Sequence, residues 1–189
     1  MNVLGVDGSG RMGGNTAALV KAFLAGAEEA GAQSTFFGLA EWTIRGCTAC
    51  KACKADPAKV CVLRDDMQRF YEIAPETDVL FLASPVYLDH ITAQLMAFIQ
   101  RTYCYLSPAL DNYWPHEGAR FVAGITYGAG DPDMYNYVLD WMEARMKFYF
   151  AIPTIGKFKI PSCSHESPIG ADHPEARRAY ELGRSLGAS

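Results

Sequence analysis

Long hydrophobic runs and an excess of basic charge are both missing from this sequence. The longest apolar stretch, Val79 to Leu88, is broken by Ser84 and Pro85. It is far shorter than the roughly 20 residues that cross a bilayer. The net charge is −4, and no basic run is interleaved with aromatic residues. These absences predict a protein that does not cross a membrane and does not bind nucleic acid.

A secretory leader and a histidine cluster are missing as well. The opening residues MNVLGVDGSG carry no basic region and no long apolar core, so we expect them to form the first strand of a cytoplasmic protein. The four histidines are scattered, so no catalytic residue is assigned. Disulfides are rare in the cytoplasm, and the six cysteines therefore need another explanation. The 189 residues suit a single domain, 1–189.

Short apolar runs alternate with helical patterns along the chain. We expect strands at 2–7, 34–39, 78–83, 120–126 and 153–160, and helices at 17–30, 65–73, 91–106, 132–150 and 174–186. Nearly all-apolar strands separated by helices indicate an α/β fold with a parallel sheet covered on both faces. Ligands of such sheets bind beyond the carboxyl ends of the strands. An insertion, 41–64, carries four cysteines between the second strand and the next helix.

The loop after the first strand is rich in glycine but matches the known nucleotide motifs poorly. Gly8, Gly10 and Gly13 satisfy G-x-G-x-x-G. The acidic partner of a dinucleotide site could only be Glu41, which lies beyond the expected end of the second strand. A P-loop would need Lys where Gly14 stands. Neither motif is convincing.

Ser9, Arg11, Asn15 and Thr16 in the same loop suit a terminal phosphate dianion. Backbone N–H groups and the helix dipole favour an anion at a helix start, while hydroxyls and a guanidinium add donors. We therefore favour the phosphate of flavin mononucleotide (FMN) over a dinucleotide. The alternative is a plain turn in which Asn15 or Thr16 caps the helix.

Two further strand ends supply candidate walls for a flavin. The segment Ser84-Pro85-Val86-Tyr87 closes the third strand, and its proline is expected to hold a turn that presents Tyr87 to a ligand. The fourth strand ends in Thr126-Tyr127-Gly128, where glycine lets the backbone approach a flat ring. Each segment alone could be an ordinary turn, but three neighbouring strand ends together indicate a flavin site.

Four cysteines of the insertion have the spacing of metal ligands. Cys47, Cys50 and Cys53 follow one another at intervals of three, and Cys61 comes after seven intervening residues. Structural zinc prefers two well-separated C-x-x-C pairs, whereas three close thiolates and one remote one are typical of a [4Fe–4S] cluster. The spacing favours the cluster. A Cys₄ zinc site and metal-free thiols are the alternatives.

Other residues near these thiols have predicted roles too. Lys51, Lys54 and Lys59 are expected to surround the thiols, partly neutralise an anionic centre and lower the thiol pKa values. Cys104 and Cys163 lie outside the ligand spacing and are interpreted as ordinary thiols.

Taken together, these motifs resemble the iron–sulfur flavoprotein family within the NADPH-dependent FMN reductase group. The resemblance rests on the loop Gly8-Ser9-Gly10-Arg11-Met12-Gly13-Gly14-Asn15-Thr16, the cysteines Cys47, Cys50, Cys53 and Cys61, the run Asp65-Asp66-Met67 and the segment Ser84 to Tyr87. The chain departs from the family at Met96 and Gln100, where relatives usually carry Lys and Asp.

The resemblance implies a flavodoxin-like three-layer fold with five parallel strands in the order 2-1-3-4-5. It also implies FMN, held by Ser9, Arg11, Gly14, Asn15, Thr16, Ser84, Pro85, Val86, Tyr87, Thr126, Tyr127 and Gly128, and a [4Fe–4S] cluster on the four cysteines. A homodimer or homotetramer is expected, in which a ferredoxin-like donor passes electrons through the cluster to FMN and on to a small-molecule acceptor.

Two other functions remain open. One is an NAD(P)H-dependent FMN or quinone reductase in which the cysteines are structural. The other is a non-enzymatic, flavodoxin-like redox sensor whose thiols bind zinc or form disulfides.

Overall fold

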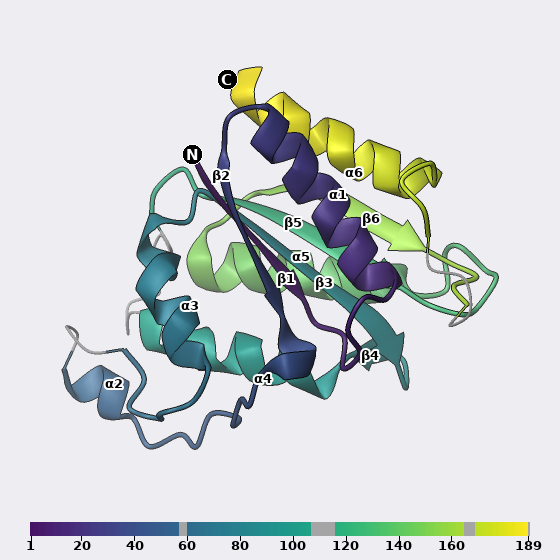
Figure 1. Cartoon of the computed structure of the whole chain (residues 1–189). Coiled ribbons are helices and arrows are strands. Elements are labelled where there is room, and N and C mark those ends of the chain that lie inside the picture. Colours follow the sequence, from purple (N-terminus) through teal and green to yellow (C-terminus); the bar gives the residue numbers. More distant parts are fainter. Residues whose placement is uncertain (57–59, 107–115, 165–168, 189) are drawn as a thin grey trace.

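A twisted parallel sheet forms the centre of the molecule (Figure 1). The computed structural model describes residues 1–56, 60–106, 116–164 and 169–188. Five parallel strands lie in the order β2 (Gln33–Gly38), β1 (Asn2–Asp7), β3 (Val79–Tyr87), β5 (Arg120–Thr126) and β6 (Thr154–Ile160). This is the predicted flavodoxin-like order, with β1 and β3 at its topological switch point.

Helices cover both faces of the sheet, as a parallel sheet requires. One face packs against α1 (Asn15–Glu29) and α6 (Pro174–Ser185). The other packs against α3 (Met67–Ile73), α4 (Ala93–Arg101) and α5 (Asn136–Phe150). Two apolar cores result, and the predicted three-layer α/β fold is confirmed.

Helices α1 and α6 approach each other unusually closely. A Cβ atom on Gly26 would lie 2.0 Å from the carbonyl oxygen of Tyr180, and one on Gly183 would lie 2.1 Å from that of Phe23. Both glycines are therefore required by the contact between the helix backbones. This contact fixes the C-terminal half of α1 against α6 on one face of the sheet.

The predicted elements agree closely with the observed ones, apart from three ends. Strand β3 continues through Pro85 to Tyr87 instead of turning at the proline, because Pro85 still pairs with Thr126 of β5. The chain then turns into the two-residue strand β4 (His90–Ile91), which runs antiparallel to β3. Helix α4 ends at Arg101 and continues as the 3₁₀ turn η3 (Thr102–Tyr105). Helix α5 starts at Asn136, after a turn in which the Tyr127 hydroxyl donates to the carbonyl of Pro132.

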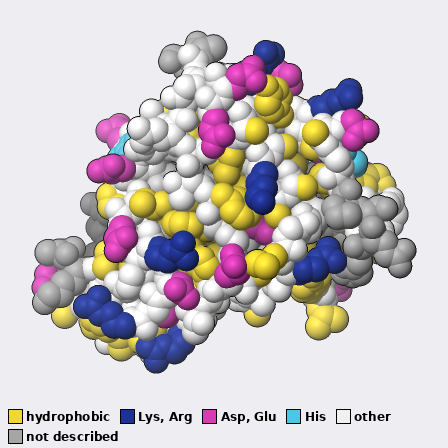
Figure 2. All heavy atoms as spheres, in the orientation of Figure 1, with side chains coloured by type: hydrophobic (Ala, Val, Ile, Leu, Met, Phe, Trp, Pro, Cys, Tyr) yellow, Lys and Arg dark blue, Asp and Glu magenta, His cyan; other side chains and the backbone are white. Residues whose placement is uncertain are grey.

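The cysteine-bearing segment leaves the sheet after β2. It begins with the 3₁₀ turn η1 (Leu39–Glu41), contains only the short helix α2 (Ala52–Ala55), and leads to α3. Two further 3₁₀ turns, η2 (Ala74–Glu76) and η4 (Leu186–Ala188), follow α3 and α6. Figure 2 shows Lys and Arg side chains gathered at the lower left of this face, where Figure 1 places α2.

Within the described ranges, we find no helix with the length and apolar character needed to span a membrane.

Candidate functional site

A cleft opens at the carboxyl ends of β1, β3 and β5. Except for Ser84, every residue predicted to contact a flavin lines it: Ser9, Arg11, Gly14, Asn15, Thr16, Pro85, Val86, Tyr87, Thr126, Tyr127 and Gly128. The structure adds Cys163 and Ser164, which follow β6. Loops from four strand ends therefore meet at the position where parallel sheets of this order bind ligands.

The glycine-rich loop is a tight turn held by its own side chains. The Asp7 carboxylate accepts the N–H of Ser9 at 2.9 Å, and the Ser9 hydroxyl oxygen accepts the N–H of Arg11 at 3.0 Å. The Arg11 guanidinium lies over Gly14, since a Cβ atom there would be 3.0 Å from Nη2. The turn therefore places a cation at the N-terminus of α1, where the helix dipole is also positive.

Asn15 and Thr16 are not the helix caps that the simpler interpretation of this loop requires. Helix α1 is preceded by Gly14 and has no side-chain cap bond. The Asn15 amide instead donates to the carbonyl of Ser164 at 3.1 Å and accepts the N–H of Ile169 at 2.7 Å. The hydroxyls of Thr16 and Thr126 are 2.8 Å apart. Both side chains tie α1 to the loops on the far side of the cleft.

Ser84 lies beneath the cleft and is fully buried. Its hydroxyl donates to the carbonyl of Pro85 at 2.8 Å and accepts the N–H of Thr92 at 3.0 Å. The Thr92 hydroxyl in turn donates to the carbonyl of Gly8 at 2.5 Å. Ser84 thus supports the floor that joins β3, α4 and the glycine-rich loop.

The rim beside Tyr87 is a hairpin turn held by two tyrosines. Leu88 and Asp89 both have positive φ, 47° and 65°. The Tyr135 hydroxyl donates to the Asp89 carboxylate at 3.1 Å, and the Tyr137 hydroxyl donates to the Asp89 carbonyl at 2.6 Å. Sequence reasoning missed this contact, because nothing in the local pattern links the hairpin to the start of α5.

Asp7 was also missed, although it forms the floor of the turn. Its side chain is 2% exposed, and burial raises its pKa to about 6, with the Ser9 N–H bond and the charges of Lys21 and Arg11 acting in the opposite direction. The one available signal was a carboxylate ending an otherwise apolar strand. A titratable group thus lies directly below the candidate anion site.

The four predicted metal ligands are free thiols on the insertion. Cys47 and Cys50 are exposed, and Cys53 and Cys61 are half-buried. A hydrogen bond from the N–H of Ala52 lowers the pKa of Cys50. Across the described residues, no three side chains of metal-binding type are gathered around one point. The donor set has the chemistry of a metal centre, but its thiols are not assembled into one here.

Cys104 lies closer to these thiols than its place in the sequence suggested. The N–H of Cys61 donates to the Cys104 sulfur, and burial raises the pKa of Cys104 to about 11. The Cys104 thiol donates to the carbonyl of Arg101 at 3.4 Å. Cys104 is thus a buried thiol in contact with the insertion, and its interpretation as an ordinary thiol stays a prediction.

Among the lysines of the insertion, Lys54 has contacts that the sequence did not predict. Lys54 donates to the carbonyls of Tyr103 at 2.7 Å, Cys104 at 3.3 Å and Leu106. Its ammonium group thus binds the end of η3, and its charge also acts to lower the pKa of Cys53 and of Cys104, as expected. Lys51 precedes α2 with a positive φ of 58°, and Lys59 lies outside the described residues.

Comparison with known proteins gives the family. Residues 1–156 match the model of the NADPH-dependent FMN reductase family. An iron–sulfur flavoprotein of Archaeoglobus fulgidus is 36% identical over 190 residues, covering 98% of this chain and 79% of the relative. One of Methanocaldococcus jannaschii is 34% identical over 102 residues, covering 54% of this chain and only 52% of that longer relative.

A solved structure shows the same fold. The NAD(P)H:quinone oxidoreductase from Methanothermobacter marburgensis superposes with a TM-score of 0.70 at 16% identity, covering 98% of this chain and 96% of the other. The strand order, the cleft at the switch point and the family match agree with one another. The chain belongs to the NADPH-dependent FMN reductase family, alongside the iron–sulfur flavoproteins, and is an FMN-dependent oxidoreductase.

Proposed function

We propose that the chain is an electron-transfer flavoprotein that binds FMN in the cleft and a [4Fe–4S] cluster on the cysteine insertion. The observation that carries the proposal is the cleft itself. A guanidinium, hydroxyls and backbone N–H groups meet at a helix N-terminus, and aromatic residues from two other strand ends face them. That combination suits a phosphate joined to a flat ring.

The phosphate end of FMN would be held by the glycine-rich loop. Arg11 supplies the positive charge, and Ser9 and Thr16 supply hydroxyl donors. Ser9 is 4% exposed and Thr16 is 2% exposed, so bonds from either hydroxyl would be shielded from water. Asn15, bonded to the carbonyl of Ser164 and to the N–H of Ile169, keeps these two residues beside the start of α1.

The ring end would lie between the segments that follow β3 and β5. Tyr87 is half exposed and can cover a ring, while Tyr127 is buried and packs edge-on against Tyr135 with ring centroids 5.0 Å apart. Gly128 leaves its backbone accessible, since a Cβ there would meet no atom closer than 3.7 Å. FMN, when bound, supplies the one- and two-electron chemistry, and these residues orient it and limit its contact with water.

Cys47, Cys50, Cys53 and Cys61 would ligate the cluster. Three observations support this: the thiols are free, all four lie on one insertion, and Cys53 lies within electrostatic range of Cys47 and Cys61. A cluster carries single electrons, which suits a one-electron protein donor of the ferredoxin type. A small molecule reaching the cleft would be the acceptor, and the protein would act as a homodimer or homotetramer.

A second candidate is an NAD(P)H-dependent quinone reductase with structural cysteines. It is favoured by the fold shared with the Methanothermobacter marburgensis quinone oxidoreductase and by the absence of an assembled thiol group in the described residues. This candidate predicts an FMN site but no iron.

The two candidates differ in which donor reduces the flavin. The anaerobically purified protein is mixed in a stopped-flow instrument with reduced ferredoxin or with NADPH, and the loss of flavin absorbance is followed. We expect fast reduction by ferredoxin and slow reduction by NADPH. Fast reduction by NADPH together with slow reduction by ferredoxin would favour the quinone reductase.

A further inference from the structure

We propose that Arg101 is a positioning residue that fixes both ends of the cysteine insertion. It thereby restricts the positions of Cys47 and Cys61, the first and last thiols of the insertion, before a metal binds. The proposal rests on the proposed function in one respect, because the thiols are taken to be the ligands of a metal centre. The clamp itself consists of contacts among described residues.

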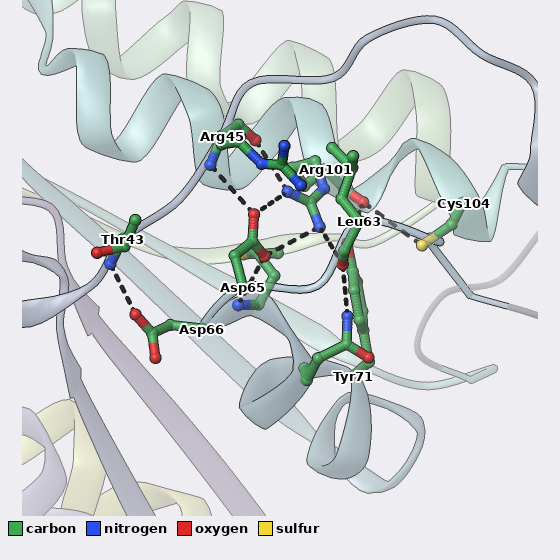
Figure 3. Close-up of polar contacts among 10 residues, drawn as sticks. Thr43, Arg45, Leu63, Asp65, Asp66, Tyr71, Arg101 and Cys104 are labelled. Atoms are coloured by element: carbon green, nitrogen blue, oxygen red, sulfur yellow. Dashed lines mark hydrogen bonds and ion pairs between the residues drawn. The ribbon is translucent and has the colours of Figure 1, made fainter.

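One guanidinium joins the two ends of the insertion (Figure 3). Arg101 Nη1 donates to the carbonyl of Arg45 at 2.9 Å, and Nη2 donates to the carbonyl of Leu63 at 3.3 Å. The same two nitrogens hold the Asp65 carboxylate at 2.6 Å and 3.1 Å. The side chain of Arg101 is 0% exposed and that of Asp65 is 4% exposed, so water does not weaken these bonds.

The carboxylates after the insertion complete the clamp. Asp65 accepts the N–H of Arg45 at 3.1 Å, and Asp66 accepts the N–H of Thr43 at 2.7 Å. The chain entering the insertion is therefore bonded to the chain leaving it. Figure 3 shows Arg45, Leu63 and Asp65 converging on Arg101, with the Thr43–Asp66 bond to one side.

The clamped carbonyls lie next to the outer ligands in the sequence. Arg45 is two residues before Cys47, and Leu63 is two residues after Cys61. Two residues of extended chain reach about 7 Å at most, so the clamp limits the separation of Cys47 and Cys61 to about 20 Å. It also shortens the loop whose ends must meet when the thiols gather round a metal, which lowers the entropy cost.

The residues at and after the end of α4 also contact the insertion, in addition to the Arg101 side chain. The Tyr71 hydroxyl and the Cys104 thiol both donate to the carbonyl of Arg101, at 3.1 Å and 3.4 Å, and fix its backbone. The N–H of Cys61 bonds to the Cys104 sulfur, and Lys54, next to Cys53, binds the carbonyls that follow α4. The segment from Arg101 to Leu106 thus contacts the insertion at Cys61 and Lys54 and holds it in place.

The free-energy cost of burying the Arg101–Asp65 ion pair indicates that Arg101 serves to position the insertion and not to stabilise the fold. Replacing a buried ion pair by packed apolar side chains is often neutral or stabilising. Nε of Arg101 is buried and has no hydrogen-bond partner in the described part of the chain. What the guanidinium provides and an apolar side chain cannot is a fixed link between two separate carbonyls.

The test compares three variants with the parent. Arg101→Lys keeps the charge but cannot bridge both carbonyls and the carboxylate. The double variant Arg101→Met, Asp65→Leu replaces the ion pair by apolar groups. Arg184→Gln is the control for loss of one arginine charge, because Arg184 is exposed on α6 and bonds to Glu181, away from the insertion.

Two readouts are needed, one of which requires no metal. In the metal-free proteins, a short bis-maleimide is added and Cys47–Cys61 cross-links are quantified by peptide mass spectrometry. In the reconstituted proteins, iron loss to a chelator is timed, and FMN per subunit and thermal melting report the fold. We expect Arg184→Gln to match the parent. The other two variants should bind FMN normally, cross-link at least about threefold less and lose iron at least about threefold faster.

The double variant separates position from stability. If it melts at or above the parent temperature yet cross-links poorly, Arg101 positions the insertion. If cross-linking and iron retention recover with stability, or if neither Arg101 variant folds, the role is structural and the proposal is overturned. A parent that takes up no iron contradicts the cluster in the proposed function, whereas the cross-linking result still decides the clamp.

Discussion

The cleft and the cysteine insertion are built in different ways. Every wall of the cleft comes from the end of a sheet strand, and its polar groups bond to one another across it, as in the Thr16–Thr126 pair. The insertion leaves the sheet and is held at its base by Arg101 and at α2 by Lys54, with Cys47 and Cys50 exposed. Under the proposed function, the cleft would be preformed for FMN, whereas the thiol site would be completed only by its metal.

The largest expected effect is the loss of iron from the insertion while FMN stays in the cleft. Replacing Cys50 with Ala should abolish iron-dependent absorption and leave the flavin band, because three remaining thiolates hold a cuboidal cluster poorly. Iron and FMN per subunit are measured after anaerobic purification. Cys163→Ala is the matched control, since Cys163 lines the cleft and should leave the iron in place. Full iron in the Cys50 variant would contradict the ligand assignment.

The next effect concerns the floor of the cleft. Because burial raises the pKa of Asp7 to about 6, the folded protein holds a proton between about pH 4 and pH 6 that the unfolded chain has released. Stability from this group is therefore present below pH 4 and lost as the pH rises through 6. Asp7→Asn should remove that loss and raise the free energy of unfolding at pH 7.5 by on the order of 3 kcal/mol.

This prediction is checked by urea unfolding of parent and variant from pH 4 to pH 8. The difference between the two curves isolates Asp7 from the other carboxylates. It should be small at pH 4 and grow until about pH 7. A difference that does not change with pH would show that Asp7 is not buried as a titrating group.

A smaller effect is expected on FMN binding alone, with the iron content unchanged. Arg11→Ala removes the cation over Gly14 and should weaken FMN binding by about tenfold to a hundredfold, since a hydrogen bond to a charged group contributes about 1.5–3 kcal/mol. Iron content should not change. Calorimetric titration of the apoprotein with FMN measures the affinity. Arg184→Ala, on the exposed side of α6, is the control and should bind as the parent does.

The smallest effect comes from the hydroxyl pair across the cleft. Thr16→Val keeps the shape of the side chain and removes one donor, so FMN affinity should fall by about fivefold, the equivalent of about 1 kcal/mol. The same titration detects it, with thermal melting as the check on the fold. An affinity equal to that of the parent would contradict the assignment of Thr16 as a phosphate donor, and Arg11 and Ser9 would remain as the proposed donors.

The sheet and the glycine-rich loop could be predicted because their signals are local. Strand β1 is an apolar run followed at once by glycines and polar donors, and the same chain segment forms both the strand and the loop. The strand order follows from the fold class that the resemblance implied. Neighbouring strand ends then had to meet at one edge, which is why residues from three separate segments were found around one cleft.

The features that sequence reasoning did not find all depend on contacts between distant segments. Ser84 was expected in the cleft, but β3 continues past Pro85 and turns that hydroxyl towards Thr92. Cys104 is beside Cys61 only because α4 packs next to the insertion. In the clamp, Arg101 bonds to Arg45, which is 56 positions away in the chain, and to Leu63, which is 38 positions away. No periodicity or spacing in the sequence indicates such contacts.

Metal analysis of the protein purified without oxygen tests the central contrast most directly. Iron, acid-labile sulfide, zinc and FMN are measured per subunit on one sample. The account predicts one FMN and about four each of iron and sulfide per subunit, with no zinc. One FMN with zinc and no iron would contradict it, leaving a flavin reductase whose insertion is structural.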